Sequence, residues 1–185
     1  MIWKHFLPAG LTILFAAPYT LGDASDEFAG RGQILVLNTT NIGSATPNDR
    51  IGCLNKHGML TLSDCAIFTH SDGIPHLSTS EGGCSFQNPR MPTNEDSIYG
   101  RNTRAWSCSD HAKPDGTPVS ETYYSLNGLD YPLICHGNLA CYYDIVANPS
   151  PSNANPAPVW GYYWGSQQMT APPGHWQVAW LWVQV

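Results

Sequence analysis

The sequence predicts an all-β protein: one domain, a β-sandwich or β-barrel stapled by disulfides, with long loops. Glycine and proline supply 17 and 15 of the 185 residues, and charged residues only 12%, about half the usual share. Short apolar runs alternate with turn residues, and no segment has the period of an amphipathic helix. A chain of this length is enough for one domain with its own core.

The expected strands are short and separated by turn-rich segments. Most are apolar, β-branched or aromatic runs bounded by glycine, proline, asparagine or aspartate. They are expected at 33–38, 53–54, 59–62, 65–69, 97–108 (interrupted at 100–102), 121–126, 129–135, 140–146, 159–164 and 177–185. Loops are expected at 40–50, 72–83, 88–96 and 110–118.

Three later segments carry further detail. Asn127-Gly128 favours a tight hairpin turn, because both residues tolerate positive φ. Residues 148–158 hold four prolines and are expected to form a surface loop within the same domain. In the last strand, one face presents Trp176, Val178, Trp180 and Trp182 and the other Ala179, Leu181, Val183 and Val185. Two apolar faces predict a central strand covered on both sides.

The N-terminus has the pattern of a cleaved signal peptide. Lys4 precedes an apolar stretch of about twelve residues, too short to span a bilayer as a helix. We expect removal of residues 1–22, leaving a secreted domain of residues 23–185. No later stretch reaches about 18 apolar residues, so no membrane span and no lipid anchor is expected.

Six cysteines follow the leader, and an even count in an exported chain indicates three disulfides. Spacing and turn residues favour sequential pairing: Cys53–Cys65, Cys84–Cys108 and Cys135–Cys141. The alternative is a metal site built from His70, Asp72 and His76, or from Cys108 and His111. Neither has the usual zinc spacing, so we predict no metal and no cofactor. Asn38-Thr39-Thr40 is an acceptor for N-glycosylation at Asn38.

Charge excludes one class of partner. The net charge is −6, and the chain without its leader holds seven basic and fourteen acidic residues. General nucleic-acid binding needs clustered Lys and Arg, so it is not expected.

No motif of a known catalytic class is present. The nearest set with suitable chemistry is a histidine and glutamate acid–base pair supported by arginines, as a small nuclease or glycan-active hydrolase would need. The candidates are Arg101, Arg104, His111, Glu121 and His136.

The aromatic residues are the remaining unusual feature. Seven Trp and Tyr residues fall within the last 26 positions. Most are expected to form core, because rings suit half-buried strands. Some are expected to face solvent as a stacking platform, and the predicted binding set is Trp160, Tyr162, Tyr163 and Trp164.

Two segments surround the first pair of cysteines: Gly52-Cys53-Leu54-Asn55 and residues 64–69 (Asp-Cys-Ala-Ile-Phe-Thr). Together with the leader, the six cysteines, the acidic charge and the aromatic C-terminal part, they give the chain its pattern. This pattern resembles small secreted cysteine-containing proteins of filamentous fungi. The effector-like and elicitor-like members of that group are the most similar. The resemblance implies an extracellular role at a host or cell-wall surface and a contribution to virulence.

The sequence therefore predicts a secreted, monomeric, non-enzymatic domain that binds an extracellular glycan or a host or cell-surface protein. Two alternatives remain open. One is a small secreted hydrolase, ribonuclease-like or glycan-active, and the other is a structural component of a cell wall.

Overall fold

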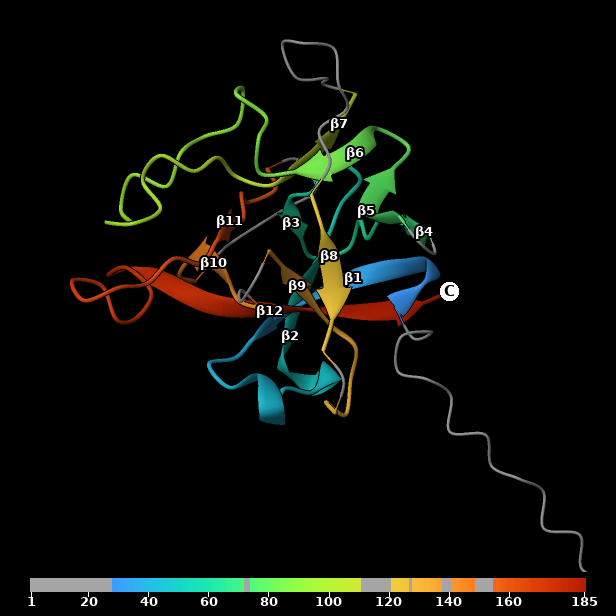
Figure 1. The fold of residues 1–185 in the computed structure, drawn as a ribbon, viewed down its shortest axis with the longest axis horizontal. Coiled ribbons are helices and arrows are strands. Elements are labelled where there is room, and N and C mark those ends of the chain that lie inside the picture. Colours follow the sequence, from blue (N-terminus) through green and yellow to red (C-terminus); the bar gives the residue numbers. More distant parts are fainter. Residues whose placement is uncertain (1–27, 72–73, 111–120, 127, 138–140, 149–154) are drawn as a thin grey trace, which may run out of the picture.

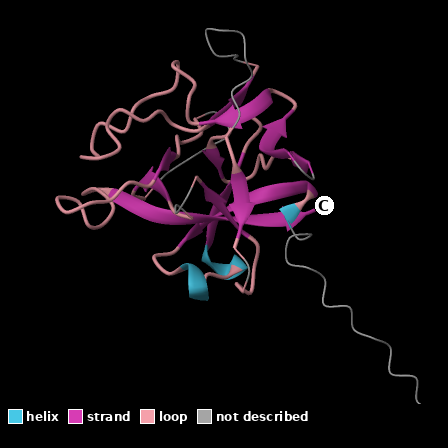
Figure 2. Cartoon of the chain, in the orientation of Figure 1, coloured by secondary structure: helices cyan, strands magenta, loops and turns pink. Residues whose placement is uncertain are grey.

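A computed structural model describes residues 28–71, 74–110, 121–126, 128–137, 141–148 and 155–185 (Figure 1). The predicted leader and most of the predicted proline-rich loop lie outside these residues. The described part is all-β, as predicted, and its helical residues are confined to short 3-10 turns such as Ile42–Ser44 and Pro47–Asp49 (Figure 2). No helix in this part is long and apolar enough to cross a membrane.

The strands, in chain order, are β1 (Gly30–Asn38), β2 (Arg50–Leu54), β3 (Leu60–Thr61), β4 (Phe68–Ser71), β5 (Ile74–Thr79), β6 (Gly82–Ser85), β7 (Ser107–Ser109), β8 (Tyr123–Ser125), β9 (Leu133–His136), β10 (Tyr143–Val146), β11 (Trp160–Gly161) and β12 (His175–Gln184). They pair antiparallel in the order β11-β10-β12-β1-β4-β5-β6-β7. Strands β2 and β3 branch from β1, and β9 and β8 branch from β12. The end strands β11 and β7 do not pair with each other. The described sheet is therefore not a closed barrel, and that part of the prediction is wrong.

Strand β12 is central, as its alternating apolar pattern predicted. It pairs with β1 from Val178 to Gln184 and also with β9 and β10. Trp180 and Trp182 belong to the larger buried cluster, while Ala179 and Leu181 belong to a second cluster. The two clusters lie on opposite faces because successive side chains of a strand point in opposite directions. The last two positions of that expected apolar face are exceptions, since Val183 and Val185 are exposed.

The larger cluster is dominated by aromatic rings. Tyr143 stacks on Trp180 with ring centroids 3.5 Å apart and planes 7° apart. Trp106 lies 4.6 Å from the same indole ring. These three side chains are completely or almost completely buried. Most of the indole surface of the C-terminal segment therefore stabilises the core, because such rings bury about 150–250 Å² each.

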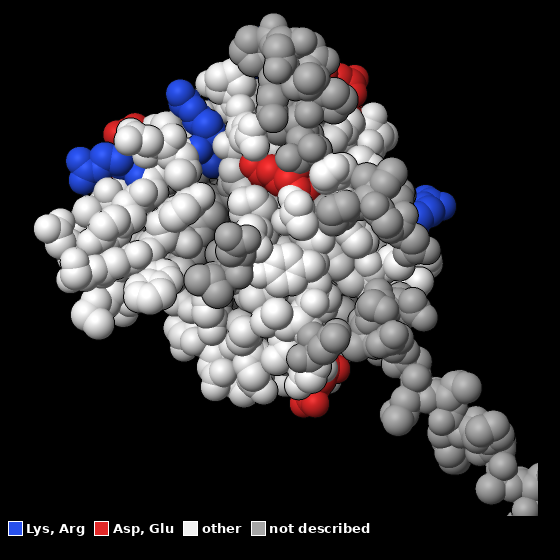
Figure 3. All heavy atoms as spheres, in the orientation of Figure 1, with Lys and Arg blue, Asp and Glu red and all other residues white. Residues whose placement is uncertain are grey.

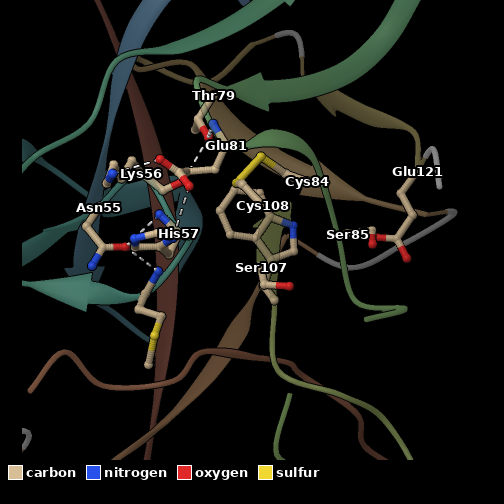
Figure 4. The surroundings of a disulfide bond; sticks show 12 residues. Asn55, Lys56, His57, Thr79, Glu81, Cys84, Ser85, Ser107, Cys108 and Glu121 are labelled. Atoms are coloured by element: carbon tan, nitrogen blue, oxygen red, sulfur yellow. Dashed lines mark hydrogen bonds and ion pairs between the residues drawn. A yellow bond between two sulfur atoms is a disulfide. The ribbon is translucent and has the colours of Figure 1, made fainter. Parts of the chain in front are cut away.

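The three disulfides join the cysteines in the predicted sequential pairs: Cys53–Cys65, Cys84–Cys108 and Cys135–Cys141. The second of these links directly opposed positions of β6 and β7. Figure 4 shows it beside Lys56, His57 and Glu81, with Glu121 on its other side. The other two bonds tie β2 and β9 to the loop residues Cys65 and Cys141, and such covalent links stabilise a sheet of short elements.

Several local expectations were wrong. Residues 74–79 form β5 and residues 82–83 begin β6 (Gly82–Ser85), where a loop was expected over 72–83. Gly82 allows the β6 backbone to lie close to Ser109 of β7, since a Cβ on it would lie 2.5 Å from the Ser109 carbonyl carbon. Strand β8 does pair with β9, but the connection between them is longer than the two-residue turn that Asn127-Gly128 predicted. Only Trp160–Gly161 of the expected 159–164 strand pairs in the sheet.

Candidate functional site

Exposed apolar side chains gather at one end of the sheet, beyond β10 and β11. We call them the aromatic patch: Ile98, Tyr99, Tyr163, Trp164 and Met169. Trp164 is 71% exposed and Met169 79%. The patch lies on two segments, the turns around 97–103 and the loop at 162–174 that leads into β12; this loop projects from the left of Figure 1. Much of this projecting end carries uncharged side chains, with basic ones along its upper edge (Figure 3).

The two segments are tied together by hydrogen bonds. Buried Gln168 accepts from the Ile98 backbone N–H at 2.6 Å and donates to the Tyr163 carbonyl at 2.9 Å. The Gln167 N–H donates to the Tyr99 hydroxyl at 3.0 Å. These bonds hold the Tyr99 ring and the backbone at Ile98 and Tyr163 in place before any ligand arrives, which lowers the entropy cost of binding.

Glycine allows the Tyr99 ring to lie against the facing loop. A Cβ on Gly165 would lie 2.4 Å from the Tyr99 Cζ atom. Real Cβ atoms do not approach other atoms so closely. The position of Tyr99 in the aromatic patch therefore depends on the absence of a side chain at 165.

The structure divides the predicted binding set. Tyr163 and Trp164 are exposed, and Tyr162 is half-buried against the Tyr142 ring. Trp160 is only 6% exposed, and its indole N–H donates to the Pro92 carbonyl at 3.1 Å. Its ring is therefore not available at the surface, which corrects the prediction for that residue.

The structure brings together two of the five predicted catalytic residues. His136 Nε2 lies 3.3 Å from Glu121 Oε2. The same oxygen accepts from the Tyr123 hydroxyl at 2.9 Å and from the Phe86 N–H at 3.0 Å, and Oε1 accepts from Gln87 at 3.1 Å. Burial would raise the pKa of Glu121, but the hydrogen bonds from His136 and Phe86 outweigh it and the pKa is lowered.

This arrangement suits a structural anchor better than a general base. Four donors occupy the carboxylate, so few lone pairs remain for a substrate proton. Tyr123 extends the network inward, because its hydroxyl also accepts from Trp106 Nε1 at 2.6 Å. Glu121 thereby joins the segment that leads into β8 to the aromatic core.

The other catalytic candidates do not join this network. Arg104 donates to the Met91 carbonyl at 3.1 Å, and Arg101 is exposed. No hydrogen bond or ion pair within the described residues links either arginine to Glu121 or His136. His111 lies outside the described residues.

A further titratable cluster was not predicted. Buried Asp144 accepts from His175 Nδ1 at 2.6 Å and from Asn94 Nδ2 at 2.8 Å. His175 Nε2 lies 3.2 Å from Asp96 Oδ2. Burial raises the pKa of Asp144, while the bonds from Asn94 and His175 oppose that effect. An acid inside an otherwise apolar strand was the signal that could have revealed it.

The proposed metal alternatives do not form a site in the described part of the chain. It holds no group of three or more His, Cys, Asp or Glu side chains placed to bind a metal ion. His70 Nδ1 contacts the Phe28 carbonyl, His76 Nδ1 contacts the Glu121 carbonyl, and Cys108 is in a disulfide. Asp72 and His111 lie outside the described residues.

Comparison with known proteins gives no relative for this chain. No family model, no curated protein and no solved structure matches it.

Proposed function

We propose that the protein is a secreted, non-catalytic β-domain that binds an extracellular glycan through the aromatic patch. The observation that carries this proposal is Trp164, a residue that is 71% exposed and lies next to exposed Tyr163 in a loop held by buried Gln168. A flat ring without a partner exposes apolar surface to water, and the apolar face of a sugar ring can cover it. Contiguous exposed apolar patches commonly mark binding sites.

Export fits the covalent structure. Three disulfides persist in oxidising compartments and are rare in the cytosol of most organisms. The signal-peptide pattern of residues 1–22 supports the same location. A role as an effector in virulence, glycosylation at exposed Asn38 and a monomeric state remain parts of the proposal.

Sedimentation with insoluble polysaccharides tests the proposal. Wild-type protein is mixed with chitin, cellulose or β-1,3-glucan particles, and the bound fraction is measured with and without Trp164→Ala. Loss of binding is expected for that variant and for Tyr163→Ala. The matched control is Leu62→Ala, since Leu62 is 57% exposed and outside the patch. Equal binding by the wild type and Trp164→Ala would overturn the proposal, and so would capture by a cell-surface protein alone.

A hydrolase is the second candidate, favoured by the 3.3 Å contact between His136 and Glu121. If it is correct, the protein depolymerises RNA or oligosaccharide, and His136→Ala abolishes turnover. If the wild-type protein binds polysaccharide but does not cleave it, the hydrolase candidate is rejected and the glycan-binding proposal is kept. The structural wall component is tested by fractionation, because such a protein would stay with insoluble wall material.

A further inference from the structure

A polar groove lies beside the opposite end of β12 from the aromatic patch. Its volume is about 460 Å³, and its lining includes Arg31, Lys56, Asp64, Ile67, Thr69 and Ser80. Arg31 directly precedes Gly32, which pairs with Gln184 near the C-terminal end of β12, whereas the patch loop enters β12 at His175. Ten strand residues therefore separate the two sites, or roughly 30 Å at a rise of about 3.3 Å per residue.

One wall of the groove is the segment 64–67, and it is covalently fixed. Cys65 within it is bonded to Cys53 of β2. The Ala66 N–H also donates to the Leu54 carbonyl at 2.9 Å. This wall cannot move far from the sheet while the disulfide is intact.

The other wall is the turn between β5 and β6, and hydrogen bonds fix it. The Thr79 hydroxyl donates to the Lys56 carbonyl at 2.7 Å and accepts from the Glu81 N–H at 3.1 Å. The Lys56 ammonium lies 2.7 Å from Glu81 Oε1. Figure 4 shows these three side chains together. Since both walls are held, the groove is formed before a ligand binds.

The charges in and beside the groove balance. Glu81 compensates Lys56, and their hydrogen bond raises the pKa of the lysine and lowers that of the glutamate. Arg31 and Asp64 supply one further charge of each sign. The Arg31 guanidinium makes no ion pair within the described part of the chain. Four charges that sum to zero do not favour an anion over a neutral ligand.

The polar groups match a polyhydroxylated ligand. Arg31 offers only donors, Asp64 only acceptors, and the hydroxyls of Thr69 and Ser80 can do both. Neighbouring hydroxyls of a sugar ring need this mixture, because each donates one hydrogen bond and accepts others. Ile67 adds an apolar contact for the C–H face of the ring. The volume falls within the range of about 300–1,000 Å³ found for small-molecule sites.

We propose that this groove is a second saccharide site, which takes a neutral mono- or disaccharide unit independently of the aromatic patch. Two sites at opposite ends of one rigid strand make the domain bivalent. It can then hold two polysaccharide chains, or two parts of one chain, at a fixed spacing, and gains avidity without new contacts. Saccharide binding in the groove does not require the patch to bind, whereas the bivalency rests on the proposed function.

Titration of ¹⁵N-labelled protein with cellobiose, N,N′-diacetylchitobiose and laminaribiose tests the groove. At least one disaccharide should shift the amide signals of residues 64–67 and 79–80. Arg31→Gln should weaken that binding about tenfold, the size expected for losing a hydrogen bond to a charged group. Arg90→Gln is the matched control, because Arg90 is also exposed but lies outside the groove.

Two further arms make the result decisive. Trp164→Ala should leave the groove shifts unchanged, even where it abolishes sedimentation with polysaccharide. Galacturonate and inorganic phosphate serve as anionic probes. The inference is overturned if no neutral disaccharide shifts these signals, if only the anions do so, or if Arg31→Gln and Arg90→Gln bind equally well.

Discussion

His175 Nδ1 lies 2.6 Å from Asp144 Oδ1, and both side chains are at most 3% exposed. The pair joins the start of β12 to β10, where the loop that carries the aromatic patch ends. Asn94 satisfies the second Asp144 oxygen, and Asp96 faces the other imidazole nitrogen. Four polar side chains thus hold the segment 94–96 against the sheet.

Asp144→Asn is expected to destabilise the protein. The carboxylate of Asp144 accepts hydrogen bonds from both His175 and Asn94. The new amide has only one oxygen, so its NH2 group would face one of these two donors and that hydrogen bond would be lost. A buried donor left without an acceptor costs about 2 kcal/mol, which corresponds to about 4–8 °C in Tm for a domain of this size. Thermal unfolding measures the change. The exposed Asp130→Asn is the control, and equal Tm values for the two variants would contradict the prediction.

Glu121 should make stability depend on acid pH. Its pKa is lowered in the folded protein because the hydrogen bonds from His136 and Phe86 outweigh the effect of burial. Between the folded and the unfolded pKa values of Glu121, the unfolded chain binds more protons than the folded one. The contribution of Glu121 to stability is therefore fully present above the ordinary glutamate pKa, and it is lost as the pH falls through the folded-state pKa. Asp144, whose pKa is raised, acts with the opposite sign.

Denaturant unfolding from pH 3 to 7 tests this dependence, by comparing the free energy of unfolding of the wild type with that of Glu121→Gln. Glu121→Gln should be less stable than wild type near neutral pH, and the gap between the two should narrow as the pH falls. Asp130→Asn should parallel the wild type over the same range. A gap that stays constant with pH would show that the carboxylate charge of Glu121 contributes nothing.

Gly165→Ala is expected to weaken glycan binding while the fold is kept. The added Cβ would lie 2.4 Å from the Tyr99 ring, so that ring must leave its place in the aromatic patch. Gly43→Ala is the matched control, since its Cβ would meet only the Asn41 side chain, at 3.4 Å. The bound fraction in sedimentation should fall for the first variant alone, with Tm values within about 4 °C of wild type. Unchanged binding would show that Tyr99 takes no part.

The sequence predicts the parts of this fold that depend on local pattern. The period-two alternation from Trp176 to Trp182 indicates the central strand, and cysteine spacing gives the disulfides. Strands β5 and β6 were missed because Pro75 and the Gly82-Gly83 pair are typical of loops. There, pairing with β4 and β7 outweighs local preference.

The candidate sites likewise divide into residues that local sequence pattern indicates and residues that only long-range contacts bring together. Tyr163 and Trp164 stand out because aromatic residues cluster in the last 26 positions, although the sequence places both in an expected strand at 159–164. Tyr99 could not be assigned to them, since its contacts with Ser166 and Gln167 join residues 67 and 68 positions apart. The pair of Asp144 and His175 is hidden for the same reason, being 31 positions apart in the chain.

The three disulfides should differ in what they contribute to stability. Their sequence separations are 24 for Cys84–Cys108, 12 for Cys53–Cys65 and 6 for Cys135–Cys141. If each acts by restricting the unfolded chain, replacing both cysteines by alanine costs about 3.5, 3 and 2.4 kcal/mol respectively. Guanidinium unfolding of the three double variants gives the order. A reversed order, with the shortest loop contributing most, would show that native packing around the sulfur atoms outweighs loop entropy.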